Sequence, residues 1–134
     1  MSKKAILYTD GGARGNPGPA GIGGVLKLGE RIEKFKKYIG EATNNQAEYW
    51  ALILGLEKAK DLGVEELDCF LDSELVVKQL NKEYRVKDKD LAPLFVKVWN
   101  LSVNFKKITF KHIFREQNKL ADKLVNEAID GRED

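Results

Sequence analysis

The order of the predicted strands and helices is the feature of this 134-residue sequence that most restricts its fold. Three strand-like segments come first, and a helical segment precedes each later strand. The strands are expected at 5–9, 20–28, 31–39, 64–71 and about 107–113. Strands joined by a tight turn pair antiparallel, whereas strands joined through a helix become parallel by right-handed crossovers. The sequence therefore predicts an α/β fold with a mixed sheet, in a single domain spanning 1–134.

The first predicted strand is followed by a segment rich in glycine and proline. Residues 5–9 form a short apolar run of the kind expected when both faces of a strand are buried. This strand is predicted to end at Asp10. Glycine and proline dominate 11–19, so we expect turns there rather than a helix or a regular strand.

Capping residues mark where the predicted helices begin. Thr43 and Gln46 have the spacing of a capping box, and Ser73 is placed to cap a second helix. The helices are expected at 43–62, 73–80, about 91–101 and from Asn118 onward. A tight turn around Gly29 and Glu30 is expected to join the second and third strands as a hairpin.

Composition is typical of a globular protein and excludes several classes. Apolar residues make up 43% of the chain and charged residues 33%, which argues against disorder. The single cysteine, Cys69, lies in an apolar run and is expected to pack in the core. No signal-peptide pattern is evident, and no stretch approaches the roughly 18 apolar residues of a membrane span. We therefore expect a cytoplasmic monomer that does not bind membranes, and a net charge of +2 alone does not indicate a nucleic-acid partner.

Four acidic residues lie at the ends of predicted strands or among apolar neighbours in predicted helices, where they are candidates for a functional site. Asp10 and Asp72 are each placed at or near the end of a predicted strand, Glu48 lies among apolar neighbours in a helix, and Asp122 repeats that pattern in the last helix. Buried carboxylates are unfavourable unless they are paired or bind a metal. Without a matching set of histidines or cysteines, such a group suits a hard cation such as Mg²⁺ and disfavours zinc. A pair of Mg²⁺ ions could activate water for in-line attack on a phosphodiester.

Five motifs together resemble the type 1 ribonuclease H family over about residues 4–130. They are Tyr8-Thr9-Asp10-Gly11-Gly12, Gly15-Asn16-Pro17-Gly18-Pro19-Ala20-Gly21, Thr43-Asn44-Asn45-Gln46-Ala47-Glu48, Asp72-Ser73 and Asn118-Lys119-Leu120-Ala121-Asp122. The resemblance implies a ribonuclease H-like fold with strand order 3-2-1-4-5 and helices on both faces of the sheet. It further implies hydrolysis of the RNA strand of RNA·DNA hybrids by two Mg²⁺ ions, for which Mn²⁺ can substitute. The implied products carry a 5′-phosphate and a 3′-hydroxyl.

The resemblance also implies roles for individual residues. Asp10 would bridge both metals, Glu48 and Asp72 would complete one metal site, and Asp122 would complete the other. The positions that match contacts to the hybrid are Gly11, Gly12, Asn16, Asn44, Asn45 and Gln46. Amide side chains both donate and accept hydrogen bonds, so they suit recognition of a 2′-hydroxyl and of base edges. The alternative for Asn44 and Asn45 is that they only complete the helix cap.

The sequence departs from the family pattern in two places. The polar loop 81–90 leaves no room for the basic, tryptophan-containing protrusion of many members, so we expect weaker substrate binding and leave double-stranded RNA open as a second substrate. His112 has the usual offset from Asp122 for the family's flexible histidine, but its surroundings predict a strand end. Arg115, in the following loop, is an equal candidate for assisting proton transfer or product release.

Two other functions compete with this interpretation. A junction resolvase or integrase core on the same fold would share the acidic cluster but cut DNA, and the Asn44-Asn45-Gln46 block argues against it. A hybrid-binding module without catalysis would be expected to lack at least one carboxylate, and all four are present.

Overall fold

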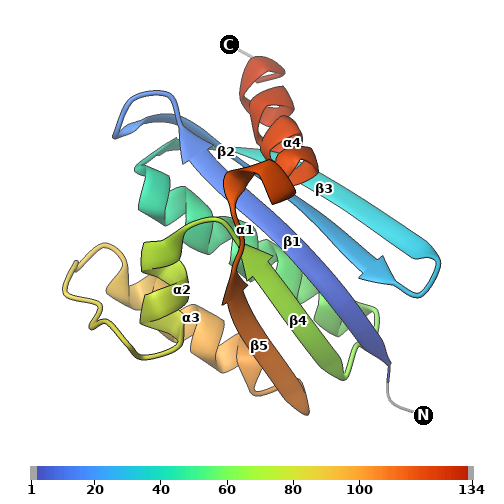
Figure 1. Ribbon diagram of the computed structural model, residues 1–134. Coiled ribbons are helices and arrows are strands. Elements are labelled where there is room, and N and C mark those ends of the chain that lie inside the picture. The colour runs from blue at the N-terminus through green and yellow to red at the C-terminus, as the bar shows by residue number, and fades with distance from the viewer. Residues whose placement is uncertain (1–2, 133–134) are drawn as a thin grey trace.

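The computed structural model describes residues 3–132, which form one five-stranded sheet with helices on both faces (Figure 1). The elements are β1 (Lys4–Ala13), β2 (Gly18–Leu28), β3 (Arg31–Ala42), α1 (Asn44–Asp61), β4 (Glu66–Leu71), α2 (Glu74–Leu80), α3 (Ala92–Ser102), β5 (Lys107–His112), the 3₁₀ helix η1 (Arg115–Gln117) and α4 (Lys119–Asp130). The strands lie in the order β3-β2-β1-β4-β5. β1 pairs antiparallel with β2 and parallel with β4, so the predicted mixed sheet and its order are confirmed.

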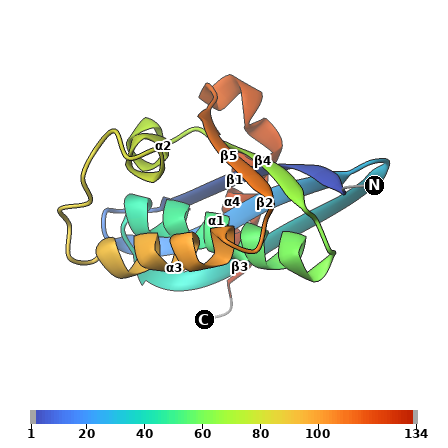
Figure 2. The same cartoon turned by 90° about the horizontal axis from the view of Figure 1, so that it is seen from below.

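The helices divide unequally between the two faces. α1 packs against β1 and β2 on one face, and α3 lies alongside α1 in both views (Figures 1 and 2). α4 crosses the other face and contacts β1, β2 and β3. The largest core cluster lies between the sheet and α1, and includes Leu7, Leu52, Ile53 and Leu56. This arrangement puts the beginning of α1 and the beginning of α4 on opposite sides of β1.

β1 is longer than predicted, because it continues through Asp10 and the two glycines to Ala13. The expectation that the strand ends at Asp10 and that 11–19 contains no regular strand was therefore wrong. Asp10 lies opposite Gly23 of β2, and the ladder continues to Ala13. Strand pairing uses backbone groups, which glycine supplies as well as any other residue.

Glycine at these positions allows helices to approach the sheet closely. A Cβ atom on Gly11 would overlap the backbone carbonyl of Ala47 in α1. A Cβ atom on Gly23 would lie 2.6 Å from the carbonyl oxygen of Ala121 in α4. The glycines therefore permit α1 and α4 to press against the sheet on either side of Asp10.

The first half of β1 is buried on one face only. Leu7 is fully buried beneath α1, whereas Ile6 on the opposite face remains 38% exposed. The prediction that this strand is buried on both faces was wrong, because α4 covers mainly β2 and β3 and leaves part of β1 open.

The predicted helix caps are confirmed. The Gln46 backbone N–H donates to Thr43 Oγ1 at 3.2 Å, and the Thr43 N–H donates to Gln46 Oε1 at 2.8 Å. Ser73 Oγ accepts from the Val76 N–H at 3.3 Å. Cys69 is buried, as expected. Across residues 3–132, none of the helices combines the length and apolar character needed to cross a membrane.

Candidate active site

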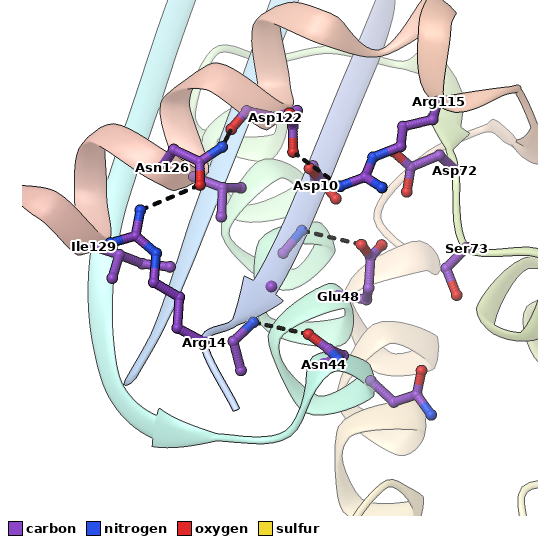
Figure 3. Close-up of a pocket in the computed structure, with 15 residues that line it drawn as sticks. Asp10, Arg14, Asn44, Glu48, Asp72, Ser73, Arg115, Asp122, Asn126 and Ile129 are labelled. Atoms are coloured by element: carbon purple, nitrogen blue, oxygen red, sulfur yellow. Dashed lines mark hydrogen bonds and ion pairs between the residues drawn. The ribbon is translucent and has the colours of Figure 1, made fainter. Parts of the chain in front are cut away.

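Four carboxylates converge on one pocket from four separate elements (Figure 3). Asp10 comes from within β1, Glu48 from α1, Asp72 from the residue after β4, and Asp122 from the first turn of α4. β1 and β4 are parallel neighbours in which Thr9 pairs with Leu71, so Asp72 emerges beside Asp10. The pocket has a volume of about 470 Å³.

Three of these side chains are close enough to share one ion. One carboxylate oxygen from each of Asp10, Glu48 and Asp72 lies within 4.8 Å of the others. Asp10 and Glu48 are 7% and 6% exposed, respectively. The Gly11 backbone N–H donates to Glu48 Oε1 at 3.1 Å, while Glu48 Oε2 is buried and has no hydrogen-bond partner within the described residues. An unpartnered buried carboxylate oxygen points to a ligand that supplies positive charge.

The electrostatics of the pocket disfavour four free carboxylates. Burial is the largest of the causes that together raise the pKa of Asp10 to about 7, and the charges of Asp72 and Asp122 act in the same direction. Burial also raises the pKa of Glu48 well above its ordinary value, and its contact with Asp10 acts in the same direction. A divalent cation would relieve this repulsion, and an all-oxygen ligand set fits Mg²⁺.

Arg115 and His112 occupy different positions relative to the carboxylates. Arg115 lies in η1 and lines the pocket, with its Nη2 atom 4.0 Å from Asp122 Oδ1. Its side chain is 81% exposed, which leaves the guanidinium accessible to a ligand. His112 is the last residue of β5, and its ring packs edge-on against Phe114 with 5.7 Å between ring centroids. His112 is outside the set of residues that line the pocket.

The residues predicted to contact substrate separate into two groups. Gly11, Gly12, Asn44 and Asn45 line the pocket. Asn44 Oδ1 accepts from the Ala13 N–H at 2.8 Å, so this side chain joins α1 to β1.

Asn16 and Gln46 lie outside the pocket lining and have structural contacts. Asn16 Oδ1 accepts from the Asn44 N–H at 2.9 Å, which ties the β1–β2 turn to the start of α1. The cap alternative considered for Asn44 and Asn45 applies instead to Thr43 and Gln46, which form the capping box.

Asn118 positions Asp72, whereas the sequence identified it only as a helix start and as part of one family motif. Its Nδ2 group donates to the Thr9 carbonyl at 2.9 Å and to Asp72 Oδ2 at 3.2 Å. The residue is 2% exposed, and its side chain does not cap α4. Its place in the same motif as Asp122, four residues earlier, was the available signal.

Arg14 also lines the pocket and was not predicted as a site residue. Its guanidinium donates to Asn126 Oδ1 at 3.3 Å (Figure 3). It also forms an ion pair with Asp130, so two residues of α4 hold the Arg14 side chain in place. The available signal was a single cation inside a segment otherwise built from small residues, asparagine and proline.

This strand order, with acidic side chains gathered where β1 and β4 lie side by side, defines an α/β domain of the ribonuclease H-like fold. A family model described as "Reverse transcriptase-like" matches residues 8–128. The chain is 44% identical to ribonuclease HI of Halobacterium salinarum over 125 residues, covering 92% of this chain and 63% of that protein. It is 32% identical to a ribonuclease H of Chlorobium phaeobacteroides over 145 residues, covering 96% of this chain and 97% of that protein.

A solved structure of LC11-RNase H1 in complex with an RNA/DNA hybrid has a TM-score of 0.89 and 46% identity, covering 94% of this chain and 96% of that chain. The chain belongs to the type 1 ribonuclease H family. It spans only 36% of the length of the mycobacterial relatives that it matches at 42% identity, one of which is a bifunctional protein of Mycobacterium tuberculosis.

Proposed function

We propose that this chain hydrolyses the RNA strand of RNA·DNA hybrids in a reaction that depends on two Mg²⁺ ions, with Mn²⁺ as a substitute. The cluster of Asp10, Glu48 and Asp72, with oxygens within 4.8 Å, is the observation that carries the proposal. A relative of this chain has been solved with an RNA/DNA hybrid bound, which supports the choice of substrate.

The four carboxylates are the proposed metal ligands. Asp10 would bridge the two ions, Glu48 and Asp72 would complete one site, and Asp122 would complete the other. Divalent cations bound there would activate the attacking water and stabilise the leaving oxygen during in-line displacement. The expected products therefore carry a 5′-phosphate and a 3′-hydroxyl.

Neighbouring groups of the chain fix the proposed ligands before any ion binds. The Gly11 N–H donates to Glu48 and orients it, and the amide of Asn118 donates to Asp72 and orients it. Such contacts reduce the rearrangement needed on metal binding. Arg115, at the rim beside Asp122, is placed to stabilise negative charge that develops on the phosphate.

Substrate recognition is proposed to use the wall of the pocket formed by β1 and α1. The backbone of Gly11 and Gly12 and the side chains of Asn44 and Asn45 lie on this wall. Backbone groups and amides can contact a 2′-hydroxyl without reading a base sequence. Asn16 and Gln46 are proposed to hold this wall in place, because they accept hydrogen bonds from the backbone N–H groups of Asn44 and Thr43, respectively.

The chemistry of the product ends tests the proposed reaction. A 5′-labelled RNA strand annealed to DNA is incubated with the protein in Mg²⁺, in Mn²⁺ and in chelator. We expect fragments in both metals and none in chelator, and we expect these fragments to prime DNA synthesis directly because they end in a 3′-hydroxyl. Fragments that prime only after phosphatase treatment, or cleavage that persists in chelator, would contradict the mechanism.

A further inference from the structure

The side of the pocket that faces the far end of α4 carries a second cation, Arg14. Among the pocket-lining residues in the described range 3–132, only Arg14 and Arg115 carry positive charge. They approach α4 at different points: Arg115 contacts Asp122 in the first turn, whereas Arg14 contacts Asn126 and Asp130 further along the helix. Two cations therefore flank the acidic centre along α4 (Figure 3).

We infer that Arg14 binds a backbone phosphate of the substrate strand next to the one that is cleaved. This inference rests on the proposed function and adds a substrate-positioning residue to it. A polyanionic strand that enters a pocket with four carboxylates needs nearby cations to balance the repulsion between like charges. A guanidinium is suited to this task because its planar array of N–H groups matches two phosphate oxygens at once.

α4 holds the Arg14 side chain at a defined distance from the acidic centre. Asn126 Nδ2 donates to the Asp122 carbonyl oxygen at 3.1 Å, and Asn126 Oδ1 accepts from Arg14 Nη2 at 3.3 Å. Asn126 lies one turn beyond Asp122, which is about 6 Å along the helix axis. This offset suits a phosphate beside the scissile one and not the scissile phosphate itself.

The ion pair with Asp130 is compatible with phosphate binding. The side chains of Arg14 and Asp130 are 44% and 66% exposed, respectively. Exposed pairs contribute little to stability, so a phosphate can replace Asp130 or share the guanidinium with it. In this account Asp130 preorients Arg14 in the free protein and competes weakly with the substrate.

A purely structural role makes a different prediction. If the pair only ties the β1–β2 turn to α4, then Arg14→Ala and Asp130→Asn break the same ion pair and both weaken hybrid binding. If Arg14 binds phosphate, the two changes have opposite consequences. Arg14→Ala removes the phosphate ligand, whereas Asp130→Asn removes its competitor and leaves the guanidinium in place.

The test measures binding of a fluorescent RNA·DNA hybrid by anisotropy in chelator at several salt concentrations, and KM and kcat in Mg²⁺. Arg31→Ala is the matched control, because Arg31 is also exposed and paired with a carboxylate, Glu33 at 3.4 Å, but does not line the pocket. We expect Arg14→Ala to weaken binding about tenfold, to reduce the slope of log K against log salt by about 0.7–0.9, and to leave kcat within about twofold. Asp130→Asn should bind the hybrid as tightly as the unaltered protein or more tightly.

Two results would overturn the inference. One is an unchanged affinity and salt slope in Arg14→Ala, and the other is a loss in Asp130→Asn equal to that in Arg14→Ala. Either result leaves the proposed nuclease activity intact. Failure of the unaltered protein to cleave the hybrid would instead contradict the proposed function. The anisotropy measurements would still show whether Arg14 binds the phosphate backbone of the hybrid.

Discussion

Asp10 and Glu48 are carboxyl groups in surroundings that disfavour their charged forms. Both are buried, and each lies beside further acidic side chains. Such a cluster lowers the stability of the metal-free protein, since repulsion and desolvation act together. The arrangement is accounted for if cations normally occupy the site, and this gives two predictions for single residues.

Replacing Asp10 with asparagine should remove activity while the protein stays folded. We expect Asp10→Asn to abolish hybrid cleavage in Mg²⁺, because the proposed bridging ligand loses its charge while its shape is kept. Removing the repulsion should raise the melting temperature in chelator at pH 8 by about 3–5 °C, the shift expected for roughly 1 kcal/mol in a chain of this size. Asp72→Asn should abolish cleavage in the same way. Turnover near that of the unaltered protein in either variant would refute the assignment of that residue as a metal ligand.

The stability of the metal-free protein should depend on pH through Asp10. Its pKa is about 7 in the folded protein, against an ordinary value of 3.8, so the folded state binds a proton more tightly than the unfolded state does. This contribution to stability is fully present below about pH 4 and is lost as the pH rises through 7. We therefore expect Asp10→Asn to exceed the unaltered protein in melting temperature by a smaller margin at pH 5 than at pH 8, in chelator. A difference that is larger at pH 5 would show that the sign is wrong.

At the level of strands and helices, the sequence predicted most elements, and its errors have physical causes. Thr43 and Gln46 revealed the start of α1 because capping is a local interaction over three residues. The second half of β1 was missed because Gly11 and Gly12 resemble turn residues until the helix that packs against them is known.

The sequence likewise predicted the acidic residues of the site but not the long-range contacts that position them. Asp10, Glu48, Asp72 and Asp122 were chosen by sequence and do meet at one pocket. The contact from Asn118 to the Thr9 carbonyl joins residues 109 positions apart, and no local pattern predicts such a contact. The pairing of Arg14 with Asp130 depends in the same way on where α4 crosses the sheet.

The elements that carry Arg115 and His112 predict which of them assists the reaction. Arg115 lies in the short η1 helix beside Asp122, whereas His112 is held at the end of β5 against Phe114. We expect Arg115→Ala to slow turnover by about one order of magnitude more than His112→Ala, within the usual range for an electrostatic or general-acid contribution. The measurement is kcat at saturating hybrid from pH 6 to 9. A larger loss in His112→Ala, with an altered pH profile, would reverse the order and assign proton transfer to the histidine.

For the whole molecule, we expect this pocket to cleave RNA paired with DNA and to need divalent cations to do so. Because the chain carries a net charge of only +2 and its loop between α2 and α3 spans only 81–91, we expect substrate choice to depend mainly on the pocket. A pocket that reads 2′-hydroxyls on one strand must reject double-stranded DNA, whereas double-stranded RNA offers the same groups on both strands.

The most direct test compares cleavage of a labelled RNA·DNA hybrid with cleavage of double-stranded RNA and double-stranded DNA of the same sequence, each in Mg²⁺ and in chelator. We predict that the RNA strand of the hybrid is cut in Mg²⁺ only, that double-stranded DNA is not cut, and that double-stranded RNA is cut more slowly than the hybrid if at all. An uncut hybrid, or double-stranded DNA cut as fast as the hybrid, would contradict the account.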